Sequence, residues 1–221
     1  MSFTTIILGI IVIILLYLLY VFYIKKSSTL VKTASLNDSN PDMTTLASGQ
    51  STRYTYAIWI YVQQWNSNGI KTIFNRTDNI KLYLDTTTPT LFCDIGLDPS
   101  GTQTVKITDN FPVQKWVYVT LSCDNTIIDA YLDGKLVNSN QLSKSPKTPG
   151  TPSANPMKLG TGFNAYVSGF TSWGSPMGPQ EVWNNYMSGN GSSAITRFFS
   201  SYNVDVAVSK DNVEQNKYRL F

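Results

Sequence analysis

The 221-residue sequence contains no histidine, and this absence removes several kinds of catalytic site at once. Serine and cysteine nucleophiles are commonly activated by a histidine base, and many catalytic zinc sites use imidazole ligands. Glutamate is also scarce, because Glu181 and Glu214 are the only two in the chain. We therefore assign no catalytic, metal-binding or cofactor-binding residue, and we expect no cofactor.

Charge is scarce too, with charged residues making up 14% of the sequence. Lys25, Lys26 and Lys32 account for the formal net charge of +3, since 14 basic and 14 acidic residues follow them. Nucleic-acid binding requires a basic face that neutralises phosphates. The sequence therefore predicts no nucleic-acid partner.

Only two cysteines are present, Cys93 and Cys123, and neither belongs to a CxxC motif. Both lie in segments whose composition is typical of β-strands. We expect two buried, reduced thiols that behave as small apolar side chains. A disulfide across the domain is the alternative, so the redox state of the pair stays open at this point.

Residues 3–24 form the one long apolar run, and they carry no charged side chain. As a helix this run would be about 33 Å long, enough to cross a hydrocarbon core of about 30 Å. A cleaved signal peptide, the alternative, would show a basic start and a small-residue cleavage site. Neither is evident, so residues 1–26 are predicted to be a single-pass transmembrane anchor, with the lipid bilayer as partner through residues 3–24.

Aromatic and basic residues gather where this run ends, as they do at a membrane interface. The predicted interface residues are Tyr20, Phe22, Tyr23, Lys25 and Lys26. The positive-inside rule then places the N-terminus outside and the C-terminal domain on the cytosolic side. Asn37, Asn75 and Asn190 fit the glycosylation pattern, which would argue for the reverse orientation, but such matches are frequent in a chain this rich in Asn, Ser and Thr.

Residues 27–52 are polar, small and without period, and we predict a spacer between bilayer and domain. Its alternative is an ordered segment lying against a neighbouring protein. The folded domain is predicted to be residues 53–221. Tyr, Thr, Val and Ile alternate there with Gly, Pro, Asn and Asp turns, which favours an antiparallel two-sheet β-sandwich.

The clearest strand pattern is Lys115 to Val137, KWVYVTLSCDNTIIDAYLDGKLV. Period-2 alternation places Val117, Val119, Leu121 and Cys123 on one face of the first strand. Asp133-Gly134 supplies the positive φ values of a two-residue hairpin turn. Further strands are expected at 54–62, 70–74, 80–84, 91–97, 102–108, 157–160 and 165–173. A short helix is expected at 179–188, with Pro179 at its first position and Gly189 after its end.

These elements, in this order, resemble the concanavalin A-like lectin/glucanase superfamily, close to its laminin-G-like branch. The resemblance covers about Tyr54 to Gly189 and implies a concanavalin A-like jelly roll. Glycosidases of this superfamily carry Glu-x-Asp-x-Glu, whereas the nearest match here, Asp129-Ala-Tyr-Leu-Asp133, lacks the central carboxylate. The chain is therefore predicted not to be an enzyme. A single calcium ion between loops, as in some laminin-G-like domains, stays open, although solvated aspartates explain these loops.

Two places could contact a glycan or a partner protein. Trp65 stands beside an Asn-Ser-Asn-Gly turn, where an exposed ring could stack on a sugar. The segment 143–156, SKSPKTPGTPSANP, reads as an extended surface loop in which Pro146, Pro149 and Pro152 could form a docking strap.

An apolar anchor, a polar spacer and a histidine-free laminin-G-like sandwich together resemble membrane-associated minor capsid proteins of large icosahedral DNA viruses. The resemblance implies a non-enzymatic structural protein that links an inner viral membrane to other capsid proteins, at the virion membrane–capsid interface. A membrane-bound, lectin-like carbohydrate-binding protein is the alternative. The sequence names neither the host nor the partners, nor the stoichiometry.

Overall fold

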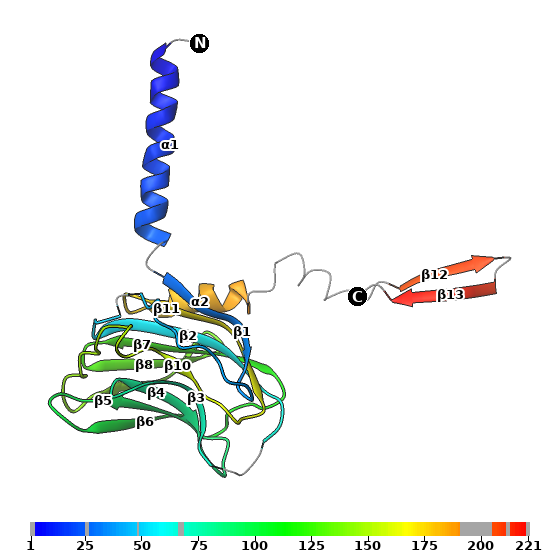
Figure 1. The fold of residues 1–221 in the computed structure, drawn as a ribbon. Coiled ribbons are helices and arrows are strands. Elements are labelled where there is room, and N and C mark those ends of the chain that lie inside the picture. The colour runs from blue at the N-terminus through cyan, green and yellow to red at the C-terminus, as the bar shows by residue number, and fades with distance from the viewer. Residues whose placement is uncertain are drawn as a thin grey trace. The chain divides into compact units, whose positions relative to one another are not determined.

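The computed structural model describes residues 3–24, 27–47, 49–65, 69–190, 205–210 and 213–219. The chain divides into two compact units, residues 1–187 and residues 188–221. The first unit contains a long helix and a β-sandwich, and the second contains one pair of strands (Figure 1).

The predicted helix over residues 3–24 is confirmed as α1 (Phe3–Ile24). No proline interrupts this run, so the backbone hydrogen-bond ladder can continue throughout. Side chains are described for residues 7–19, and the large apolar ones are exposed, from 42% at Ile7 to 67% at Ile13. Among the residues whose side chains are described, which in α1 are 7–19, no helix is both long and apolar enough to cross a membrane.

The predicted antiparallel two-sheet sandwich is confirmed. The larger sheet has the strand order β1-β11-β2-β7-β8-β9 and the smaller has the order β10-β3-β4-β5-β6. In the larger sheet these are β1 (Ser27–Ser35), β11 (Ala165–Trp173), β2 (Arg53–Val62), β7 (Trp116–Asp124), β8 (Ile127–Leu132) and β9 (Lys135–Gln141). In the smaller sheet they are β10 (Lys158–Leu159), β3 (Lys71–Arg76), β4 (Ile80–Leu84), β5 (Leu91–Gly96) and β6 (Thr102–Thr108).

The inward face of β7 confirms the predicted alternation, because Val117, Val119, Leu121 and Cys123 all belong to the core between the sheets. The outward face of β7 is covered as well. Helix α2 (Pro179–Ser188), confirmed at its predicted bounds, packs there. A second buried cluster lies beneath it, formed by Ala57, Tyr118, Tyr131, Met177 and Val182.

Residues 27–52 differ from the predicted spacer. β1 is an edge strand of the larger sheet, antiparallel to β11, with Ser27 opposite Trp173 and Ser35 opposite Tyr166. Leu36, next along the chain, is fully buried. The sandwich therefore begins at residue 27 rather than 53, and β1 is ordered by its pairing with β11.

Two features explain why the sequence pattern did not predict β1 as a strand. β1 is half-exposed at a sheet edge, so its residues include Ser, Thr and Lys rather than a run of large apolar side chains. A register shift between Thr29 and Val31 also breaks the period of two.

The C-terminal residues also differ from the predicted single domain over 53–221. β12 (Asp205–Lys210) and β13 (Val213–Arg219) pair only with each other and form a separate two-stranded sheet. The spacing of Ile195, Phe198 and Phe199 predicts a short amphipathic turn, and these residues lie outside the described part of the chain. The concanavalin A-like sandwich consequently ends with α2.

Strand directions decide which turns meet at the same end of the sandwich. β1 begins at Ser27, beside the end of β11 and the turn after β7. The turns at 77–79 and 97–101 and the segment 143–156 lie at this end too, joined by backbone hydrogen bonds from Gly96 to Asn79 and from Leu142 to Thr126. We call it the Ser27 end. The opposite end carries Trp65 and the loops 85–90 and 109–115.

Candidate functional site

The segment 143–156 is an ordered strap, held by a buried arginine. Arg76, at the end of β3, is 1% exposed. Its Nε donates to the carbonyl oxygen of Asn155 at 2.9 Å, and its Nη2 donates to that of Gly150 at 2.7 Å. The side chain of Asn155 in turn donates to the carbonyl oxygen of Thr77 at 2.8 Å. A strap fastened at several points presents a fixed surface.

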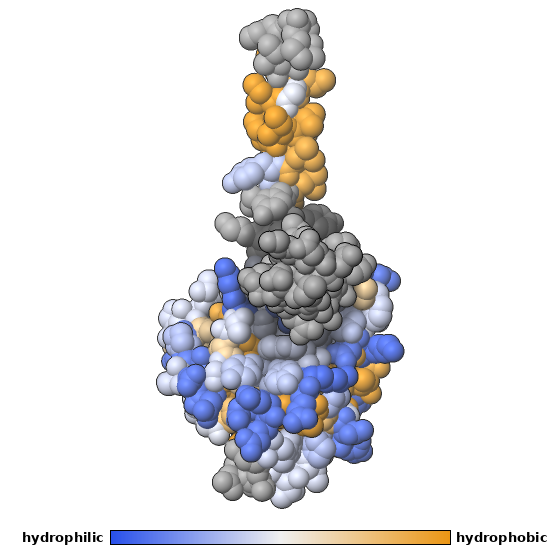
Figure 2. Space-filling view, turned by 90° about the vertical axis from the view of Figure 1, so that its right-hand side faces the viewer, coloured by the Kyte–Doolittle hydropathy of each residue, from blue (hydrophilic) through white to orange (hydrophobic). Residues whose placement is uncertain are grey.

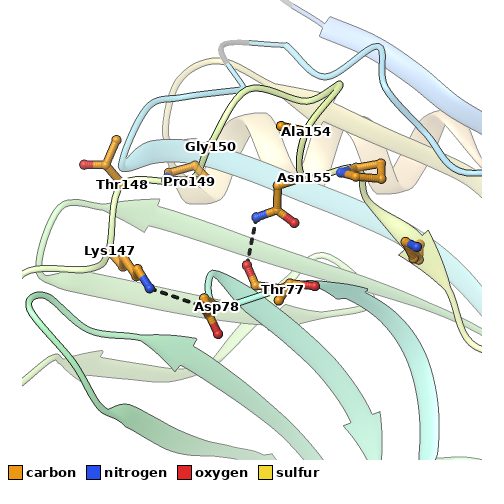
Figure 3. Close-up of a pocket in the computed structure, with 10 residues that line it drawn as sticks. Thr77, Asp78, Lys147, Thr148, Pro149, Gly150, Ala154 and Asn155 are labelled. Atoms are coloured by element: carbon orange, nitrogen blue, oxygen red, sulfur yellow. Dashed lines mark hydrogen bonds and ion pairs between the residues drawn. The ribbon is translucent and has the colours of Figure 1, made fainter.

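A hollow of about 390 Å³ lies between this strap and the β3–β4 turn (Figure 3). It is lined by Thr77, Asp78, Lys147, Thr148, Pro149, Gly150, Ala154, Asn155, Pro156 and Lys158. Two smaller hollows, of about 150 and 240 Å³, adjoin it and share Asp78. The Asp78 turn is thus the centre of a hollowed surface at the Ser27 end.

Two lysines and one aspartate line the large hollow, and a second aspartate, Asp42, pairs with one of the lysines from outside the lining. Lys147 Nζ lies 3.1 Å from Asp78 Oδ2, and Lys158 Nζ lies 3.2 Å from Asp42 Oδ2. All four side chains are at least 42% exposed, so each pair contributes only about 0–1 kcal/mol to stability. Such weakly held charges can exchange partners with a ligand at little cost.

The predicted contact prolines are placed differently from expectation. Pro146 and Pro149 are buried, and Pro146 forms a β-bridge with Leu97. Pro152 is half-buried. The strap turns its prolines toward the domain because Arg76 pulls the backbone carbonyl groups inward, so Lys147 and Thr148 provide its outer surface.

Trp65 is not a free stacking platform. Its ring is half-buried against the core, and Lys71 Nζ lies 4.4 Å from the ring centroid. The Lys71 ammonium also donates to the carbonyl oxygens of Asp85 at 3.2 Å and Thr86 at 2.7 Å. Burial lowers the pKa of Lys71, and the nearby Asp85 charge opposes that shift. We attribute a structural role to this pair.

The other predicted residues are described only in part. Tyr20, Phe22 and Tyr23 lie within α1, but their side chains fall outside the described residues, as do Lys25 and Lys26 altogether. Cys93 and Cys123 are buried free thiols, as predicted. Burial raises the pKa of Cys123 to about 12, which leaves this thiol unreactive at neutral pH.

The carboxylates that most resemble a glycosidase pair have separate structural partners. Asp133 Oδ1 accepts the backbone N–H of Tyr118 at 2.9 Å, and Asp129 Oδ1 accepts the hydroxyl of Ser139 at 2.5 Å. Among the described residues, no group of three or more Cys, Asp or Glu side chains could hold a metal ion.

Sequence reasoning missed an aromatic surface on the outer face of the smaller sheet. Tyr83 and Phe92 are directly opposite each other on β4 and β5, with stacked rings whose centroids are 5.7 Å apart. Asp94 Oδ1 accepts hydrogen bonds from the Tyr83 hydroxyl at 3.1 Å and the Thr104 hydroxyl at 2.7 Å. Lys81 Nζ lies 4.8 Å from the Tyr83 ring. Alternation does place Tyr83 and Phe92 outward, but only the register brings them together.

The fold has counterparts among solved structures. The receptor-binding domain of botulinum neurotoxin D matches with a TM-score of 0.55 at 13% identity, over 73% of this chain and 47% of that one. The binding domain of botulinum neurotoxin DC in complex with rat synaptotagmin II gives 0.56 at 11%, over 73% and 46%. The serotype D ligand-binding domain in complex with N-acetylneuraminic acid gives 0.54 at 12%, over 73% and 45%. This chain spans less than half the length of these toxin domains, and the likeness concerns the fold.

No curated protein matches the chain. A family model does match, over residues 36–183, which is well over half of the sequence, and it describes the concanavalin A-like lectin/glucanases superfamily. The match begins at Leu36, directly after β1, and therefore does not include β1. The chain therefore belongs to the concanavalin A-like lectin/glucanases superfamily.

Proposed function

We propose that this chain is a non-enzymatic membrane tether, in which α1 crosses a bilayer and the sandwich binds a protein shell. The observation that carries the proposal is the direct joining of the two parts: a helix of 22 residues without charge runs to Ile24, and the sandwich begins at Ser27. If α1 is inserted in a bilayer, the sandwich is held at the surface of that bilayer.

The exposed apolar side chains of α1 support its insertion. Figure 2 shows the surface of this helix as largely apolar, whereas the visible surface of the sandwich is largely polar. Each Leu, Ile, Phe or Val at the centre of a membrane helix contributes about −0.3 to −0.6 kcal/mol to insertion. Residues 7–19 supply most of this favourable contribution, because all but Gly9 and Tyr17 are Ile, Leu or Val.

The composition of the sandwich supports binding rather than catalysis. The two glutamates are far apart in the sequence, and Asp129 and Asp133, which come nearest to the glycosidase motif, accept hydrogen bonds from separate structural partners. By its resemblance in architecture, we assign the tether to a viral setting, as a minor capsid protein between inner membrane and shell. Lys25 and Lys26 favour a cytosolic location of the sandwich before assembly.

Fractionation of purified particles tests this function. We expect the full-length protein to co-purify with particles, to resist extraction by high salt, and to be loosened at its membrane end by detergent. Recovery only in cell membranes, with none in purified particles, would contradict the capsid role.

A glycan-binding function is the second candidate, and the Tyr83–Phe92 surface favours it. Stacked aromatic rings beside Asp94, Thr104 and Lys81 offer an apolar platform next to hydrogen-bonding groups, which is what a sugar ring requires. Trp65 no longer supports this candidate, because Lys71 occupies its ring.

A glycan array with the full-length protein in detergent would test this second candidate. Binding that is lost in Phe92→Ala and kept in Tyr166→Ala would establish it, since Tyr166 is an exposed ring on the other sheet. Binding that both variants retain would exclude the Tyr83–Phe92 surface.

A further inference from the structure

The place where the chain enters the sandwich limits how the sandwich can stand on a membrane. This inference rests on the proposed function, in which α1 spans the bilayer. Only Lys25 and Lys26 separate Ile24 from Ser27, so the Cα atoms of Ile24 and Ser27 are at most about 11 Å apart. The interfacial layer on each side of the hydrocarbon core is about 5–8 Å thick. Ser27 must therefore lie in or just above the lipid headgroups.

The opposite end of the sandwich is far from Ser27 along the strands. β1 has nine residues and is about 30 Å long, so Ser35 is about 30 Å from Ser27. The turns at 77–79 and 97–101 and the strap 143–156 share the Ser27 end. The loops at 85–90 and 109–115 belong to the other end, where Phe111 donates a backbone hydrogen bond to Pro89.

The hollow at the Ser27 end has the chemistry of a zwitterion-binding site. Lys147 and Lys158 provide two ammonium groups on its rim, and Asp78 and Asp42 provide two carboxylates beside them. Lys147, Lys158 and Asp78 line the hollow, and the pairing of Lys158 with Asp42 brings the sum of the four charges to zero. Both signs at one place suit a ligand with separated positive and negative groups better than a plain anion. A volume of about 390 Å³ admits a phosphate with a short amine-bearing arm.

We propose that the Ser27 end rests on the headgroup layer, with the Lys147–Lys158 hollow taking a zwitterionic phospholipid headgroup. The phosphate is bound by the two lysines, and the ammonium is bound by Asp78. This arrangement leaves the opposite end, with the 85–90 and 109–115 loops, free for the shell protein. It also reassigns the strap 143–156 from protein docking to membrane contact.

Fluorescence quenching in vesicles tests the orientation. Full-length protein would be reconstituted in phosphatidylcholine vesicles that contain a lipid with a nitroxide on its headgroup. Single cysteines at exposed sites would carry the fluorophore: Thr148→Cys and Ser100→Cys at the Ser27 end, Thr87→Cys and Asn110→Cys at the other. Cys93 and Cys123 give no background, because both are buried. We expect strong loss of fluorescence at the first two sites and none at the last two.

Charge variants test the hollow itself. Lys147→Gln combined with Lys158→Gln should reduce the quenching of the Ser100→Cys label, because the headgroup loses its phosphate contacts. Lys115→Gln combined with Lys135→Gln is the matched control outside the hollow and should leave quenching unchanged. Soluble glycerophosphocholine, added in excess to the labelled Ser100→Cys protein, should reduce the quenching, because the free headgroup competes with the lipid for the hollow.

The possible results distinguish a failure of the headgroup contact from a failure of the proposed membrane tether. Protein that washes off the vesicles in alkaline carbonate would overturn the membrane tether, and the headgroup contact with it. Protein that is retained but equally quenched at both ends would overturn only the orientation. Quenching at the Ser27 end that the Lys147/Lys158 pair of changes leaves intact would overturn the headgroup site.

Discussion

Arg76 Nη2 donates a 2.7 Å hydrogen bond to the carbonyl oxygen of Gly150, which is 74 residues away in the sequence. The guanidinium is buried, and among the described residues no carboxylate pairs with it. Backbone carbonyl groups of the strap take that role. A buried cation satisfied in this way fixes the strap, and with it the hollow, to the end of β3.

Removing this arginine should loosen the strap. In Arg76→Ala two strap carbonyl groups lose a charged donor, so we expect a loss of about 2–4 kcal/mol in the free energy of unfolding. Cleavage within 143–156 should become faster in limited proteolysis. Arg53→Ala is the control, because Arg53 pairs with Asp124 on the exposed surface and should contribute less than about 1 kcal/mol. Equal effects of the two changes would contradict the clamp.

Leu36 should prove essential to the sandwich although it lies in the segment that reads as a spacer. Its side chain is fully buried, so Leu36→Ala should cost about 2–5 kcal/mol in denaturant unfolding. Leu136→Ala provides the control, since Leu136 is 49% exposed and should change stability by about 0.5 kcal/mol or less.

Truncation gives a second measurement of the same boundary. A protein that begins at residue 27 keeps β1 and should give a β-dominated circular dichroism spectrum with cooperative unfolding. A protein that begins at residue 53 loses β1 and Leu36 and should not unfold cooperatively. Identical unfolding curves for the two proteins would place the start of the domain at 53 after all.

Gly96 should tolerate no side chain. It ends β5 against the β3–β4 turn, and a Cβ atom there would overlap the backbone carbonyl of Asp78. Gly96→Ala must shift that turn, which we expect to destabilise the protein by about 1–3 kcal/mol. Gly178→Ala is the control, because a Cβ atom added at Gly178 would have no neighbouring atom within 4 Å. Thermal unfolding of both variants would measure the difference.

Stability should fall in alkali because of buried tyrosine. Burial raises the pKa of Tyr118 from 10.0 to about 12. The neutral phenol is favoured in the folded protein, so this contribution is complete below about pH 10 and is lost as the pH rises toward 12. Two pKa units correspond to about 2.7 kcal/mol.

Denaturant titrations from pH 8 to pH 12 would measure this contribution. Tyr118→Phe should make the alkaline decline in the free energy of unfolding shallower. Tyr166→Phe, at a ring that is 41% exposed, should leave the decline as it is in the parent protein. A decline of the same depth in Tyr118→Phe would assign it to other groups.

Local signals in the sequence were sufficient for most of the elements. The charge-free run predicted α1, and alternation predicted both faces of β7. Asp133-Gly134 predicted the hairpin turn between β8 and β9, where φ is 48° and 78°. Pro179 and Gly189 marked the bounds of α2. These features depend on backbone preference and side-chain period over a few neighbouring residues, so one segment carries enough information to determine each of them.

Only the tertiary structure decided the boundary and the site. β1 is a strand because β11, about 140 residues later, offers it an edge. Asp78 and Lys147 meet because Arg76 draws the strap onto the β3–β4 turn, and Tyr83 faces Phe92 because β4 and β5 pair in that register. Contacts of this kind join residues that are distant in sequence, and no local period or turn residue encodes which distant partner each one will find.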